Sequence, residues 1–343
     1  MNITVLQMKK CLTLLVATLA YVNSQAQDPH FSQFFSSPLT LNPAYTGKFD
    51  GDFRAAGNYR NQWPTINNAY TTATASIDFP ILASHIPEFD TWGVGIMALN
   101  DQSGNKILNN NFISISTAYH KSLDEDGLQQ LAVAFQGTYA NKRLDVTKAT
   151  FEDQLTALGF TGVTQEVFNN NIVAVNYFDF NTGVLYTGST NGFNSYYLGA
   201  SMYHLNRPKE SFQGGNFLLN PRLTIHGGGY VPIDQSKTFH GSFIYQRQAG
   251  ATETVLGGAV AFNLNGDEDN PTSLYTGIWY RFGDAFIPYV GLEFTGLRIG
   301  YSYDVNNSSL NTASNSRGGN EISLIYVHRP SDPNRKKLKC PKF

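Results

Sequence analysis

Histidines are the side chains of this sequence best suited to metal binding or proton transfer, but their spacing fits neither. Four of them lie in separate stretches of the chain: His120, His204, His226 and His240. A structural or catalytic metal needs several ligands held together, which short motifs reveal by fixed intervals. We therefore interpret these histidines mainly as polar residues of a protein interior, with a metal site as the less favoured alternative.

Two acidic turns and one glycine run complete the list of candidates. Asp124-Glu125-Asp126 and Asp267-Glu268-Asp269 lack the spaced oxygen ligands of a calcium loop, so they are expected to be solvated turns. Gly227-Gly228-Gly229 lies within an expected strand, where glycine marks a bend or close packing. No metalloprotease, serine-hydrolase or paired-cysteine motif occurs. We predict no catalytic residue, no metal site and no cofactor, and hence a protein that is not an enzyme.

The composition points to a membrane protein. Of 343 residues, 15% are charged and 13% aromatic, whereas soluble domains carry roughly 25% charged residues. Beyond the N-terminus, apolar runs such as Val255 to Phe262 are much shorter than the ~20 residues of a spanning helix. Only helices and closed barrels satisfy their backbone hydrogen bonds in lipid. The expected fold is therefore all-β, a transmembrane antiparallel β-barrel, and nothing indicates nucleic-acid binding.

Period-two alternation runs along most of the chain. In the clearest segment, Ile299 and Tyr301 fall on one face and Arg298 and Asp304 on the other, which predicts lipid and lumen faces respectively. The segments are about ten residues long, as membrane strands require. About fourteen strands are expected, centred near residues 56, 74, 96, 116, 135, 182, 200, 226, 243, 259, 278, 290, 301 and 325. Lumen charges, with Arg281 and Glu293 among them, either line a channel or pair to close it.

Aromatic residues recur near the expected strand ends, where interfacial girdles require them. They are Trp92, Tyr119, Tyr139, Tyr186, Tyr196, Tyr203, Phe282 and Tyr303. With both termini in the periplasm, the long connections fall on the extracellular side. The expected long connections are residues 100–111, 141–175, 205–221 and 306–320. A short helix is expected within residues 151–168.

Residues 1–26 have the features of a secretory signal peptide. Lys9 and Lys10 precede an apolar run from Leu12 to Val22, and Ser24-Gln25-Ala26 offers small residues for cleavage. The alternative is a buried N-terminal strand. We expect export to the outer membrane, where lipid surrounds the barrel.

Three further regions follow the expected signal peptide. Residues 27–52 are rich in Phe, Pro and Asn and too apolar for water, so they are predicted to pack in or on the barrel, in the manner of a plug. The barrel itself is expected to span residues 53–328. Residues 329–343 form a basic periplasmic tail, with six basic residues against Asp332. This tail is either merely solvated or contacts a partner through Arg335, Lys336, Lys337, Lys339, Cys340, Pro341 and Phe343.

Several stretches resemble landmarks of the PorP/SprF family, which is tied to type IX secretion and gliding motility. The first is QDPHFSQFFSSPLTLNPAYTG at 27–47; later ones are YRNQWP at 59–64, GASMYHLNRP at 199–208, GLRIGYSYD at 296–304, NEISLIY at 320–326 and CPKF at 340–343. The residues that carry the first match are Asp28, Pro29, Phe31, Ser32, Gln33, Asn42, Pro43, Ala44, Tyr45 and Gly47.

The resemblance implies an outer-membrane barrel associated with the type IX secretion system. It implies partners in that machinery and a secreted or surface cargo protein, such as an adhesin, whose export or surface retention the barrel assists. A diffusion channel or transporter for small or apolar solutes is the runner-up. An outer-membrane lipid hydrolase is a third hypothesis, but no sequence motif supports it.

Overall fold

The computed structural model describes residues 28–66, 69–167, 170–212, 215–266 and 272–329. The expected signal peptide and the tail residues from 330 onward lie outside these described residues. None of the helices in the described part of the chain has the length and apolar character to cross a membrane.

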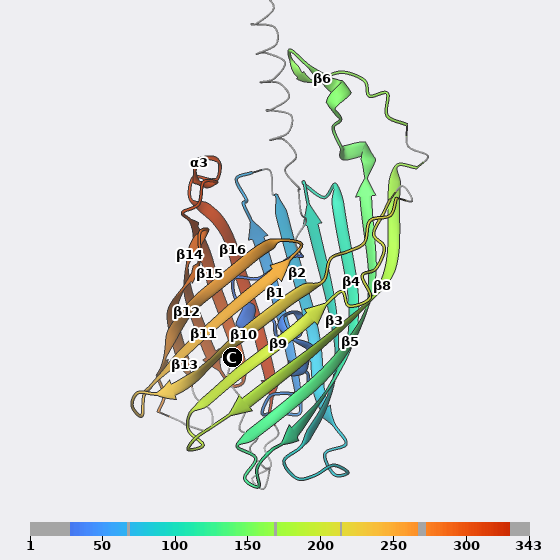
Figure 1. Ribbon diagram of the computed structural model, residues 1–343. Coiled ribbons are helices and arrows are strands. Elements are labelled where there is room, and N and C mark those ends of the chain that lie inside the picture. Colours follow the sequence, from blue (N-terminus) through green and yellow to red (C-terminus); the bar gives the residue numbers. More distant parts are fainter. Residues whose placement is uncertain (1–27, 67–68, 168–169, 213–214, 267–271, 330–343) are drawn as a thin grey trace, which may run out of the picture.

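Fourteen long strands form one closed antiparallel barrel, and each strand pairs with its neighbours in chain order (Figure 1). They are β1 (Phe53–Gln62), β2 (Tyr70–Ile81), β3 (Thr91–Ser103), β4 (Leu108–Ser122), β5 (Gln129–Asp145), β8 (Ile172–Gly188), β9 (Ser195–Tyr203), β10 (Arg222–Pro232), β11 (Lys237–Gln248), β12 (Ala251–Asn263), β13 (Ser273–Arg281), β14 (Ala285–Phe294), β15 (Leu297–Asn306) and β16 (Arg317–His328). The barrel closes where β1 pairs with β16, from Phe53↔His328 to Gln62↔Gly319. The predicted fold class is confirmed.

The two faces of the wall follow the alternation of the sequence. On β15, Ile299 and Tyr301 are 39% and 42% exposed on the outer surface, while Arg298 and Asp304 are buried. The same division separates outward Phe135, 64% exposed, from inward Ala134. An apolar outer band and a polar inner face are what a bilayer imposes on a barrel. The predicted faces are therefore confirmed.

The long connections gather at one end of the barrel (Figure 1). The connection from β5 to β8 carries two 3-10 turns, η3 (Val146–Lys148) and η4 (Glu152–Gln154), and a two-stranded sheet of β6 (Leu155–Thr156) and β7 (Gly159–Phe160). The connection from β15 to β16 carries α3 (Asn311–Ser314). The short helix expected within 151–168 thus amounts to the single turn η4.

Two details of the sequence prediction were wrong. Residues 100–111 are not a long loop, because β3 and β4 continue to Ser103 and from Leu108 and a tight turn joins them. Tyr203 does not belong to an outer girdle. It is buried inside the barrel, with the Arg222 guanidinium 4.3 Å from its ring centroid.

Candidate functional site in the barrel lumen

The N-terminal segment, residues 28–52, lies in the lumen, enclosed by the strands of the barrel (Figure 1, blue). It folds as three short turns: η1 (Phe34–Ser36), α2 (Pro38–Leu41) and η2 (Pro43–Tyr45). Proline opens α2 and η2, where its missing N–H costs nothing. Asn42 caps η2, since its Oδ1 accepts the Ala44 N–H at 2.8 Å. The segment therefore has compact local order of its own.

At the loop-bearing end, Asp28 is held between two strands and a loop. Its Oδ2 lies 2.7 Å from Nε2 of His204 and 3.3 Å from Nη1 of Arg222, and its N–H donates to Oε1 of Gln248 at 2.8 Å. His204 also contacts Asp179 through Nδ1, at 2.9 Å. Burial alone would lower the pKa of His204, but the two carboxylates outweigh it and raise that pKa to about 9. His204 is therefore an imidazolium at neutral pH.

Ser32 sits in a buried cluster of charges. Its Oγ donates to Oδ1 of Asp304 at 2.7 Å and accepts from Nη2 of Arg281 at the same distance, and Arg60 also reaches this hydroxyl. Its N–H donates to Oε2 of Glu321 at 2.7 Å. Both arginines pair with Asp304 at 2.9 Å. Charges of opposite sign thus meet around the segment, which is how buried ions are tolerated.

The next residue, Gln33, continues this network toward the middle of the barrel. Its Nε2 donates to Oγ of Ser302 at 3.1 Å and to the backbone oxygen of Glu321 at 2.9 Å. Its Oε1 accepts from Oγ of Ser323 at 2.6 Å. Residues of β15 and β16 therefore satisfy both the NH2 group and the oxygen of the Gln33 amide.

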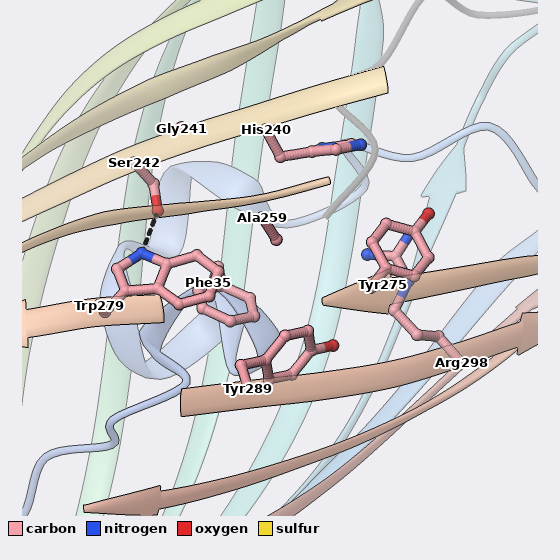
Figure 2. A pocket seen from close by; sticks show the side chains of 9 residues that line it. All are labelled: Phe35, His240, Gly241, Ser242, Ala259, Tyr275, Trp279, Tyr289 and Arg298. Carbon is pink, nitrogen blue, oxygen red and sulfur yellow. Dashed lines mark hydrogen bonds between the residues drawn. The ribbon is translucent and has the colours of Figure 1, made fainter. Parts of the chain in front are cut away.

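Phe35 packs into an aromatic region of the wall. Its ring stacks on Trp279 with centroids 4.6 Å apart and meets Tyr289 edge-on at 5.4 Å. Figure 2 shows these rings beside a cavity of about 30 Å³, with the Trp279 Nε1 hydrogen-bonded to Ser242 Oγ at 3.0 Å. Such a volume holds about one water molecule. The region is therefore nearly filled.

Asn42 anchors the middle of the segment to the opposite wall. Its Nδ2 donates to the backbone oxygen of Val184 and lies near Nε2 of His226, both at 3.0 Å. A Cβ on Gly183 would lie 1.9 Å from the Asn42 Oδ1. Glycine at this position of β8 therefore makes room for the segment.

Toward the other end, the backbone of Thr46 and Gly47 touches the wall directly. The Thr46 oxygen accepts from Nε2 of His120 at 2.9 Å, and the Gly47 N–H donates to Oδ2 of Asp78 at 2.8 Å. Gly47 has φ +75°, and a Cβ on it would lie 2.6 Å from the Cα of Gly93. Two glycines thus allow backbone to approach backbone.

The ten signature residues all lie in this segment, and all but Asp28 and Pro29 are buried. The lumen charges named from sequence pair with one another: Arg298 with Glu293 at 2.6 Å and Arg281 with Asp304. Sequence reasoning missed Arg60 and Glu321 as anchors of the segment; their only signal is an inward position on β1 and β16. Within the described residues, no group of three or more acidic, His or Cys side chains could hold a metal ion.

Comparison with known proteins identifies one family. A family model described as type IX secretion system membrane protein PorP/SprF matches residues 23–326. No curated protein matches the chain in sequence.

Among solved structures, the Ralstonia pickettii toluene transporter TbuX is 10% identical (TM-score 0.49), covering 84% of this chain and 92% of that one. The Pseudomonas putida toluene transporter TodX is 8% identical (TM-score 0.47; 88% and 94% covered). The KdgM porin is 6% identical (TM-score 0.40; 80% and 99% covered). At scores below 0.5, these likenesses carry no argument about function.

Proposed function

Because the chain belongs to the PorP/SprF family of type IX secretion system membrane proteins, we propose that it binds a secreted cargo protein and assists its export or its retention at the cell surface. The chain is an outer-membrane β-barrel associated with that secretion system. A large surface adhesin is the kind of cargo that we propose.

The packing of the N-terminal segment is the observation that carries this proposal. A diffusion channel needs a continuous polar path, whereas residues 28–47 contact inward side chains from Gln248 at the loop-bearing end to Asp78 near the other. Ser32, Asn42 and Ala44 are at most 1% exposed. We propose that the segment acts as a plug and that the barrel works through protein partners rather than as a pore.

We also propose that the protein is not an enzyme. Several buried histidines and carboxylates of the lumen hold the segment, among them His120 and Glu321. A reaction would need such groups to face a substrate instead.

The experiment is deletion of the gene followed by labelling of surface proteins with a membrane-impermeant reagent. We expect one secreted protein, or a small set, to disappear from the surface and to return when the wild-type gene is restored. An unchanged surface proteome, together with reduced uptake of a small apolar solute, would instead favour the transporter.

For the basic tail, we propose a contact with an acidic surface of the periplasmic secretion apparatus. Removing residues 330–343 should leave the amount of folded barrel unchanged but reduce cargo display. Recovery of the apparatus with the barrel should weaken as salt rises, because charge attraction is screened over ~8 Å at physiological ionic strength. Equal recovery and display after truncation would leave the tail as a solvated end.

A further inference from the structure

The outer part of β8 has a strand partner on one side only. Its register with β5 is continuous from Gln129↔Gly188 to Asp145↔Ile172. Its register with β9 runs only from Thr182↔Met202 to Gly188↔Tyr196. The first ten residues of β8 therefore extend beyond its pairing with β9.

The chain that leaves β9 closes only the nearest part of this gap. Leu205 donates its N–H to the Phe180 oxygen at 3.0 Å. Asn206 accepts the Phe180 N–H at 3.1 Å and donates to the Phe178 oxygen at 2.7 Å. Arg207 then has φ +46°, a left-handed conformation, and pairing with β8 stops.

Further along this connection, Glu210 contacts the inner side of the barrel. Glu210 forms an ion pair with Lys142, which belongs to the row of β5 that faces the lumen, as the buried Thr138 and Ala140 do. The ion pair thus places Glu210 against the inner face of the β5–β8 hairpin rather than along the edge of β8.

The backbone of residues 172–176 consequently presents a free edge. Hydrogen-bonding direction alternates along an antiparallel strand, so the groups of Ala174 and Asn176 point the same way as those of Phe178, away from β5. Among the described residues, the backbone N–H and C=O groups of Ala174 and Asn176 have no hydrogen-bond partner. Unpaired backbone groups are not tolerated in hydrocarbon, so this edge lies outside the bilayer on the loop-bearing side.

Strand length agrees with that location. β8 has 17 residues, whereas ~9–11 cross a membrane. Two of the outward side chains beside the free edge are large and apolar, with Ile172 55% and Phe178 67% exposed, while Asn176 between them is polar. An exposed strand edge with unpaired backbone groups is a template for another strand.

We propose that the edge formed by residues 172–176 of β8 accepts an extended segment of the cargo protein as an additional β-strand. The identity of the partner rests on the proposed function; the free edge does not. A row of backbone donors and acceptors is complementary only to another extended backbone, and the flanking Ile172 and Phe178 offer apolar surface to alternate side chains of the incoming strand.

The experiment uses the full-length barrel in detergent micelles and, as the probe, the purified secreted protein that deletion of the gene removes from the surface. Amide hydrogen exchange at Ala174 and Asn176 should be fast in the free barrel and slower by at least about tenfold in the complex. Amides of residues 182–188, already paired with β9, should not change. Ala174→Pro removes one edge donor without breaking a present hydrogen bond, and proline is compatible with an edge. It should weaken binding about tenfold, whereas Ala174→Val should bind like wild type.

The outcomes separate the two proposals. A complex that forms with unchanged exchange at residues 172–176 and equal affinity of Ala174→Pro would overturn the edge inference and leave the proposed function standing. Protection that depends on barrel concentration alone would also overturn it, because a second copy would then occupy the edge. If deletion of the gene removes no protein from the surface, the proposed function fails, and with it the choice of partner.

Discussion

Two parts of the N-terminal segment are held in the lumen by different physical means. In the outer part, residues 28–33, Ser32 lies among Arg281, Asp304 and other buried ions. In the middle part, residues 42–47, Asn42 bonds to backbone oxygen and rests on a glycine of the wall. Buried ion pairs predominate in the outer part, and close contact between backbone and glycine predominates in the middle part.

The difference predicts what each part is sensitive to. A buried ion that loses one partner leaves the other uncompensated, so the outer part should respond strongly to changes of charge and pH. A tightly packed backbone has no room for added atoms, so the middle part should respond to changes of volume. A change of volume in the outer part, or a change of charge in the middle part, should therefore have a smaller effect.

The largest effect is expected from Asp304→Asn. The substitution removes the buried carboxylate that Arg60 and Arg281 share, while Arg60 keeps Glu321 and Arg281 keeps Glu253 as ion-pair partners. Breaking a buried pair costs about 3–5 kcal/mol of unfolding free energy when the remaining charge is uncompensated, so we expect a loss of about 3 kcal/mol here. Urea-induced unfolding in detergent or liposomes measures it. The matched control is Asp234→Asn, which breaks the exposed ion pair with Lys237 and should leave the unfolding midpoint unchanged. Equal midpoints for both variants would contradict a charge-held outer part.

A smaller effect is expected from Gly183→Ala in the middle part. The new methyl group would overlap Asn42, and overpacking of this kind costs about 1–3 kcal/mol. The control, Gly137→Ala, adds the same methyl group on β5 where no atom lies within 4 Å, so it should be neutral or stabilising by less than about 1 kcal/mol. If Gly183→Ala were as stable as Gly137→Ala, the middle part would be loosely packed.

The third effect concerns pH. The pKa of His204 is raised from 6.5 to about 9 in the folded protein, so the protonated ring contributes stability that is complete below pH 6.5. That contribution is lost as pH rises through about 9. The unfolding free energy of wild type, minus that of His204→Gln, should therefore decrease between pH 6.5 and 9.5. A constant difference across this range would show that Asp28 does not hold a charged imidazole.

The strands were predictable because one physical cause produces them. Each of the fourteen expected centres falls within an observed strand, since a lipid face and a lumen face impose period two on the sequence. The prediction failed at residues 100–111 because these strand ends are polar on both faces. Asn100 bonds across the turn region to Asn109 and Asn111, each at 2.8 Å, so the strands continue without apolar alternation.

The lumen contacts were less predictable. The apolar character of residues 27–47 predicts packing against the barrel; Phe31, Phe34 and Leu39 of this segment are buried. The residues that bind the segment could not be predicted. Alternation shows only that Arg60 and Glu321 point inward, which is equally true of a side chain in a water-filled channel and of one that binds the segment. Only the closed barrel brings residues 32 and 321 together.

The central claim is that the N-terminal segment closes the lumen, and conductance across planar lipid bilayers tests it most directly. Wild-type protein should give no steady conductance, because we propose that residues 28–47 plug the interior. A variant lacking residues 28–47, with folding checked by its resistance to protease, should be less stable and should conduct ions steadily. A folded deletion variant that conducts no more than wild type would contradict the account, as would steady wild-type conductance equal to that of the variant.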